Sequence, residues 1–177
     1  MTESPAPKPN LIVITGIQAA GKSTVARLLA QRFERGVHIE ADVLQRMIVS
    51  GGEWPAAPGD MSDEAKRQLR LRLRNACLLA RSFFEAGFTP VIDDIIIGER
   101  WEHLKSDLEG LPLTLVVLAP KPEVVVAGRG KRVLGEKWAR YLDGELRSTL
   151  AGASIWIDNS EQTPGETVEE GIRRLEA

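Results

Sequence analysis

The strongest chemical signal in the sequence is the segment from Gly16 to Ser23, which reads GIQAAGKS. Glycine, four residues, glycine, lysine and serine is the spacing of a phosphate-binding loop. Glycines let the backbone curl so that its N–H groups point inward, and the N-terminus of the following helix adds its positive dipole end. The segment therefore predicts a cradle for the phosphates of a nucleotide.

The loop residues have separate expected roles. We expect Lys22 to reach the β- and γ-phosphates as a point charge, and the Ser23 hydroxyl to ligate Mg²⁺. A plain glycine turn with an exposed lysine is the alternative, and it is disfavoured because the loop leaves an apolar strand and opens an amphipathic helix. The residues expected to bind ATP are Gly16, Gln18, Ala19, Ala20, Gly21, Lys22, Ser23 and Thr24.

Asp42 is a candidate for acid–base chemistry. It follows a short predicted strand, Val37 to Glu40, at the carboxyl edge where open α/β sheets bind ligands. A helix is predicted over Ala41 to Val49, and the alternative role of Asp42 is to be the N-cap of its part from Val43 to Val49, which aspartate does well. The two roles can coexist at one residue.

Asp93 and Asp94 are candidates for the metal. They interrupt an apolar strand predicted over Phe88 to Ile97, and strand alternation points them to opposite faces. Adjacent carboxylates in an apolar segment are costly to bury unless a cation or donor meets them. We expect one of the two to serve Mg²⁺ through water. The alternative is a pair of solvated turn acids.

A basic, glycine-rich stretch from Gly128 to Gly135 carries Arg129, Lys131 and Arg132. Mobile glycines with arginines suit a lid that closes over the nucleotide and neutralises charge on the transferred group. A solvated basic loop is the alternative.

Other features are less specific. The loop from Ser50 to Asp60 carries Trp54, which either covers an acceptor or packs onto the domain as a hydrophobic plug. We expect most arginines of the long helix after Ser62 to form an exposed face, and Cys77 to be buried on its apolar face. His38 and His103 have no partner at meaningful spacing.

The length, net charge, cysteine count and apolar runs of the chain limit which functions are possible. Its 177 residues suit one domain, and its net charge of −2 gives no reason to expect nucleic acid or an anionic membrane as a partner. One cysteine permits no intrachain disulfide, and the longest apolar runs are too short to span a bilayer. We expect a disordered leader over 1–9, a domain over 10–177 and a cytoplasmic location.

Strands and helices alternate along the domain, which predicts an α/β fold with a parallel sheet of five strands and helices on both faces. Thr163, Pro164 and Glu166 form a capping box, so the last helix begins at Pro164. The other expected elements are strands at Leu11–Thr15, Leu113–Leu118 and Ser154–Asp158, and helices at Lys22–Phe33, Glu99–Leu108, Pro122–Ala127 and Lys137–Leu150.

These motifs and their order resemble the chloramphenicol phosphotransferase-like branch of the P-loop kinases, which is similar to the shikimate and gluconate kinases. The resemblance runs from Leu11 to about Leu175, and its carriers are the phosphate loop, Glu40-Ala41-Asp42, Val91-Ile92-Asp93-Asp94, the Arg129 to Arg132 segment and Ile157-Asp158-Asn159-Ser160. It implies a three-layer fold with a mobile lid. It also implies that Asn159 contributes to the nucleotide site.

The resemblance further implies that Asp42 accepts the proton of an acceptor hydroxyl, and that Arg129 or Arg132 acts with Lys22 in catalysis. The expected activity is transfer of the γ-phosphate of ATP, with Mg²⁺, to a hydroxyl of a small molecule, either antibiotic-like or a metabolite. Two alternatives remain open. One is a nucleoside or polynucleotide kinase, and the other is a nucleotide-binding switch that transfers no phosphate.

Overall fold

The computed structural model of the chain describes residues 10–56, 59–127, 135–152 and 155–177, in which five parallel strands form one sheet. The strand order is β2-β3-β1-β4-β5. Every residue of the central strand is buried, which explains its continuous apolar run. The predicted five-stranded parallel sheet is confirmed. The strands are β1 (Leu11–Gly16), β2 (Gly36–Glu40), β3 (Thr89–Asp93), β4 (Leu113–Leu118) and β5 (Ile155–Ile157).

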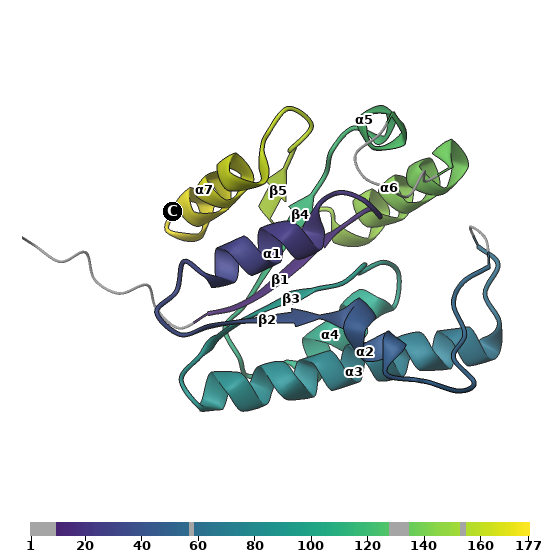
Figure 1. Cartoon of the computed structure of the whole chain (residues 1–177), viewed down its shortest axis with the longest axis horizontal. Helices are drawn as coiled ribbons and strands as arrows, with labels where there is room; N and C mark the ends of the chain where they lie inside the picture. The colour runs from purple at the N-terminus through teal and green to yellow at the C-terminus, as the bar shows by residue number, and fades with distance from the viewer. Residues whose placement is uncertain (1–9, 57–58, 128–134, 153–154) are drawn as a thin grey trace, which may run out of the picture.

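Helices cover both faces of this sheet. The helices α1 and α7 pack side by side on one face, and α3 and α4 pack together on the other (Figure 1). Right-handed crossovers in opposite directions along the sheet require this division. No described helix is long and apolar enough to cross a membrane. The helices are α1 (Lys22–Ala30), α2 (Ala41–Arg46), α3 (Asp63–Glu85), α4 (Arg100–Asp107), α5 (Pro122–Val126), α6 (Glu136–Leu150) and α7 (Pro164–Leu175).

The helices α3 and α7 start at side-chain caps. The Ser62 hydroxyl accepts the Ala65 N–H at the start of α3. At α7, Thr163 and Glu166 complete the expected capping box, each side chain accepting the other's backbone N–H. Such caps stabilise a helix by about 1 kcal/mol each, because they satisfy N–H groups that the helix itself leaves open.

The predicted third strand is too long at its carboxyl end. It ends at Asp93, four residues before the expected Ile97. The Asp94 carboxylate accepts the N–H of Ile95, and the N–H of Ile96 donates to the side chain of Thr15. The chain leaves the sheet because side-chain oxygens have replaced its ladder partners.

The carboxyl ends of three neighbouring strands lie level with one another. Asp93 is in register with Ile14 of β1 and with Glu40 of β2. The phosphate loop follows β1, and Asp42 follows β2 by two residues. The sheet therefore brings the loop, Asp42 and the pair Asp93 and Asp94 to one edge.

The free thiol of Cys77 lies in the core, as expected, with 1% of the residue exposed. Burial, with the nearby Asp107 carboxylate as the next cause, raises the pKa of Cys77 to about 12. An unfolded chain would ionise this thiol near pH 8.5. The contribution of the neutral thiol to stability is therefore fully present below pH 8.5 and is lost as the pH rises toward 12.

We predict that the free energy of unfolding falls faster with pH in the natural chain than in Cys77→Ala. The expected difference in slope is about 1.4 kcal/mol per pH unit above pH 8.5. Urea unfolding at several values between pH 8 and 10 measures it. Equal slopes in the two proteins would show that the thiol ionises as easily folded as unfolded.

Candidate active site at the carboxyl edge of the sheet

The phosphate loop has the backbone of an anion-binding nest. Ala19 and Gly21 lie in the left-handed region, with φ of 62° and 91°, and the Ala20 N–H donates to the Ile17 carbonyl oxygen at 3.2 Å. The N-cap residue Gly21 provides no side-chain cap for α1. The first N–H groups of α1 are therefore free of a capping side chain at the mouth of the loop, where an anion would be favoured.

Lys22 lies among the candidate acids. Its ammonium group donates to the Ile17 carbonyl oxygen at 2.9 Å. Burial lowers the pKa of Lys22, and the charges of Asp93, Asp42 and Asp94 oppose this effect in that order. The structure therefore brings all three aspartates within electrostatic range of the loop lysine.

Asp93 joins the phosphate loop to β2. Its Oδ1 accepts the Ser23 hydroxyl at 2.9 Å, and its Oδ2 contacts Nε2 of His38. The side chain of Asp93 is 6% exposed, so both partners reduce the cost of its burial. His38 was expected to be an ordinary histidine, and the sequence gives no signal for this contact, because the partners are 55 positions apart.

The donor set at this point suits Mg²⁺. Magnesium prefers oxygen ligands and commonly takes one or two carboxylates together with phosphate oxygens and water. The Ser23 hydroxyl and the Asp93 carboxylate supply such oxygens beside the loop. No cluster of three or more His, Cys, Asp or Glu side chains able to hold a metal occurs in the part of the chain that the structure describes.

Asp94 faces the opposite side of the sheet and meets two arginines. Its two oxygens pair with guanidinium groups of Arg72 and Arg100, and 1% of its side chain is exposed. Between two arginines, this carboxylate has no free oxygen directed at the phosphate loop. Of the two aspartates expected to serve the metal, the geometry therefore favours Asp93.

Asp42 lies in the first turn of α2 and reaches toward α3. The N-cap of α2 is Glu40, so the interpretation of Asp42 as the N-cap is wrong. The helix starts at Ala41, two residues earlier than that interpretation required. The Asp42 carboxylate is half-exposed and accepts a hydrogen bond at 3.2 Å from Nη1 of Arg72.

Most of the five arginines of α3 were expected to form an exposed face, and this expectation is wrong, because two of them are exposed and Arg72 is buried. Its side chain is 6% exposed. Helical spacing carried the missed signal, because Ala65, Gln68, Arg72 and Ala76 share the buried face of α3. A glutamine and an arginine in that stripe mark a place where buried polar groups must find partners. Arg67 and Arg74 are exposed as expected.

The loop after α2 is fastened to α3 by Gln68. The Gln68 side chain donates to the Gly51 carbonyl oxygen at 2.7 Å and accepts the Glu53 N–H at 2.8 Å. Trp54 follows directly, is 48% exposed, and places its ring centroid 5.8 Å from the Arg72 guanidinium carbon. A hydrophobic plug would not leave half its surface in solvent, so the plug interpretation of Trp54 is disfavoured.

The remaining candidates lie in different places. The Asn159 side chain donates to the Ala20 carbonyl oxygen at 3.0 Å and is buried behind the loop, so it supports the loop from the end of β5. Gln18 is half-buried, and Thr24 is exposed in the first turn of α1. Arg129 and Arg132, with the rest of the predicted lid over 128–134, lie outside the described residues.

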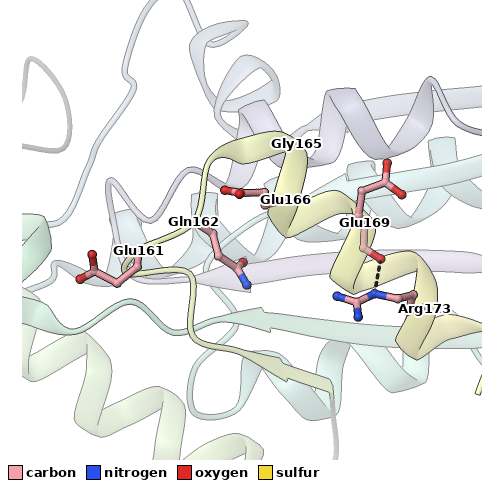
Figure 2. A pocket seen from close by; sticks show the side chains of 6 residues that line it. All are labelled: Glu161, Gln162, Gly165, Glu166, Glu169 and Arg173. Carbon is pink, nitrogen blue, oxygen red and sulfur yellow. Dashed lines mark hydrogen bonds between the residues drawn. The ribbon is translucent and has the colours of Figure 1, made fainter.

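A surface cavity of about 510 Å³ lies elsewhere, along the start of α7 and the loop before it. Figure 2 shows the polar side chains that line it, and Glu169 and Arg173 are joined there by a hydrogen bond from the arginine Nε to the glutamate backbone oxygen. None of the candidate active-site residues lines this cavity. Its lining residues are Glu161, Gln162, Gly165, Glu166, Glu169 and Arg173.

Comparison with known proteins agrees with the fold. The Zeta toxin family model matches residues 1–80, which contain the phosphate loop, Asp42 and Trp54. The search of curated proteins gives no match. In solved structures, a gluconokinase from Sinorhizobium meliloti superposes with a TM-score of 0.67 at 18% identity, covering 95% of this chain and 92% of that one.

Two further structures agree. Shikimate kinase from Aquifex aeolicus has a TM-score of 0.62 at 19% identity, covering 93% of this chain and 95% of that chain. Thymidylate kinase from Candida albicans has a TM-score of 0.69 at 14% identity, covering 94% and 91%. The chain has the fold of the P-loop kinases. At these identities the likeness establishes the fold, and the site must supply the argument for activity.

The two loop glycines are required for different reasons, which can be tested. A Cβ at Gly16 would lie 2.5 Å from the Leu118 carbonyl oxygen of β4, whereas a Cβ at Gly21 would meet no atom within 4 Å. Gly21→Ala then adds only the strain of a left-handed alanine, about 1–2 kcal/mol. Gly16→Ala also forces β1 from β4.

We expect Gly16→Ala to lower the free energy of unfolding by clearly more than Gly21→Ala. Urea unfolding measures the free energy of unfolding of both variants. Calorimetric titration with ATP measures the nucleotide affinity of the loop in each. An equal loss of stability in the two would contradict the close approach of the loop to β4.

Proposed function

We propose that this chain is a phosphotransferase that uses ATP and Mg²⁺ and moves the γ-phosphoryl group to a hydroxyl of a small molecule. The observation that carries the proposal is that the Ser23–Asp93 pair lies beside Lys22 at the uncapped start of α1, with Asp42 within electrostatic range of Lys22. The kinase fold supports it.

The donor side of the proposed reaction is made by the loop. The amides from Gly16 to Ser23 would hold the nucleotide phosphates, and the Lys22 ammonium would exchange its bond with the Ile17 carbonyl for a γ-phosphate oxygen. Bound Mg²⁺ would neutralise charge on the β- and γ-phosphates, held by Ser23 and Asp93. Asn159 would keep the loop in place from behind.

The acceptor side is made by Asp42. The hydroxyl oxygen would form a bond to the γ-phosphorus while the bond from that phosphorus to the bridging oxygen breaks, and ADP leaves. The hydroxyl proton passes to the half-exposed carboxylate of Asp42. Because the transition state of phosphoryl transfer is loose, this carboxylate contributes mainly by holding the hydroxyl in line.

Two alternative functions are a kinase with a different acceptor and a nucleotide switch with none. Thymidylate kinase shares the fold, which keeps a nucleoside or nucleotide acceptor as a second candidate. A polynucleotide acceptor is less favoured because the chain has a net charge of −2 and most arginines of α3 either are exposed or pair with acids. A nucleotide switch would need no acceptor carboxylate, so the position of Asp42 speaks against it.

The activity is tested by incubating the protein with ATP and MgCl₂ and a panel of hydroxyl compounds. The panel spans chloramphenicol, gluconate, shikimate, thymidine, thymidylate and an oligonucleotide, and ³¹P NMR detects each phosphorylated product. Transfer to a hydroxyl of one small molecule supports the proposal, whereas transfer to the phosphate of thymidylate would favour a nucleotide kinase. Tight binding of ATP without transfer to any member or to water would favour the switch.

We predict that Lys22→Ala loses ATP affinity and loses turnover by roughly 100-fold or more, because a charge aimed at the transferred group is removed. Calorimetry with ATP and the rate of ADP release measure the two effects. Lys66→Ala is the matched control, since it removes an exposed lysine from the first turns of α3. Unchanged affinity and turnover in Lys22→Ala would refute the assignment of the loop.

We also predict that Trp54→Ala raises the acceptor KM by roughly 10-fold, because a flat apolar surface is lost next to Arg72, the partner of Asp42. ATP affinity and the thermal midpoint should change little, since the ring is half-exposed. Trp101→Ala is the control, because that indole packs against the core on α4. A Trp54 variant that melts early yet keeps its acceptor KM would restore the plug interpretation.

A further inference from the structure

Arg72 connects two carboxylates that differ in exposure. Its Nη1 donates to Oδ1 of Asp42 at 3.2 Å, and its Nη2 donates to Oδ1 of Asp94. The Asp42 side chain is 50% exposed, while those of Arg72 and Asp94 are 6% and 1% exposed. One guanidinium thus joins the proposed base at the rim of the site to a charge fixed in the interior.

The buried end of this link is held without help from Asp42. The Asp94 carboxylate also receives Nη2 of Arg100 and the N–H of Ile95. Arg100 is fixed in turn by bonds to the carbonyl oxygens of Leu69 at 3.2 Å and Ile95 at 2.9 Å. The position of the Arg72 guanidinium is therefore set by the interior, and its second amino group presents a donor at a fixed place.

Arginine is the residue type that this link requires. Its guanidinium is planar and always charged, and its two terminal nitrogens diverge toward separate partners. A lysine at this position could supply one point charge and could not span both carboxylates in fixed geometry. The requirement for a fork distinguishes an orienting role from simple charge balance.

We propose that Arg72 is a positioning residue, which holds the Asp42 carboxylate in the orientation that accepts the acceptor proton. This inference rests on the proposed function, because it assumes that Asp42 is the base. A carboxylate free to rotate at the rim would spend part of its time directed away from the hydroxyl, and a displacement of about 1 Å can cost roughly 100-fold in rate.

The same turn of α3 also fixes the acceptor loop. Gln68 lies four residues before Arg72 on the buried face and holds Gly51 and Glu53, while Arg72 lies beneath the ring of Trp54. Helix α3 therefore sets the positions of both the Asp42 carboxylate and the Trp54 ring. Gln68→Leu removes the bonds to the loop, and with them a bond from Gln45 of α2, but leaves Arg72 in place. It should raise the acceptor KM more than it lowers kcat.

The test compares Arg72→Met, Arg72→Lys and Arg100→Met. Arg100→Met is the matched control because it removes the other partner of Asp94 without touching Asp42. Should Arg100→Met fail to fold, Arg70→Met replaces it, since Arg70 pairs with Asp107 from the same helix. The acceptor is the panel member with the highest turnover, or water if none is phosphorylated.

We expect Arg72→Met to lower kcat by roughly 10- to 100-fold with ATP affinity nearly unchanged, and Arg72→Lys to recover only part of the loss. Arg100→Met should lose stability and keep most of its kcat. In an Asp42→Asn background, Arg72→Met should change kcat less than about twofold, because the residues act as a unit. Additive losses, or an equal loss of kcat in the Arg100 control, would overturn the proposal.

A second measurement separates this inference from the proposed function. Crystal structures of the natural chain and of Arg72→Met show whether the Asp42 carboxylate turns away from the phosphate loop in the variant. If the natural chain transfers phosphate to no acceptor, including water, the proposed function fails and these structures alone decide the role of Arg72. A turned carboxylate supports the positioning role, and an unmoved one overturns it.

Discussion

The proposed acceptor half of the site depends on one buried carboxylate, that of Asp94. An ionised carboxylate taken out of water costs several kcal/mol unless charged partners and hydrogen bonds compensate. Asp94 receives Arg72 from α3, Arg100 from the first turn of α4 and the N–H of Ile95. The end of β3 and two helices are therefore held together by one charge. Removing Arg72 would leave Asp94 with partners, whereas removing Asp94 would leave two buried cations facing each other.

The neighbouring aspartates of β3 serve opposite faces of the sheet. Side chains alternate along a strand, so Asp93 points toward α1 and bonds Ser23, while Asp94 points toward α3 and bonds Arg72. A single dipeptide at a strand end thus links the proposed donor half of the site, on one face, to the proposed acceptor half on the other. A shift of one residue in the register of β3 would exchange these two roles.

Local features of the sequence were sufficient for the fold. The phosphate loop, the alternation of strands and helices, and the caps at Ser62 and Thr163 each depend on residues within one or two turns of one another. Strand β3 was predicted too long because three isoleucines after Asp94 continue the apolar pattern. The N–H groups of Ile95 and Ile96 donate to side-chain oxygens of Asp94 and Thr15 instead of to a strand backbone, and periodicity carries no information about such partners.

The contacts around Asp42 could not be predicted in the same way. Arg72 lies 30 positions from Asp42 and 22 from Asp94. Because it is one of five arginines in the same helix, the sequence does not distinguish it from residues of a solvated face. The contact of His38 with Asp93 is equally distant in sequence. The sequence could show that Asp42 and Asp93 reach one edge of the sheet. Which cation meets which carboxylate depends on how α3 rotates against the sheet.

One proposed half of the site consists mostly of backbone and the other of side chains, and this difference decides how much of each half can be recognised from the sequence. The phosphate cradle is mostly backbone, so it demands glycines at fixed spacing and can be recognised in eight residues. The proposed acceptor side consists of side chains from α2, α3 and the loop after α2. A rigid scaffold tolerates many different sequences in such a loop. Trp54 and Asp42 are each about half-exposed there, held by partners that are almost wholly buried. In the proposed function an acceptor enters at this rim, so the residues proposed to select it lie where the fold constrains sequence least. The fold can therefore be shared among kinases named for different acceptors. The proposed acceptor of this chain has to be identified by direct assay, because the fold does not specify the side chains around Asp42 and Trp54.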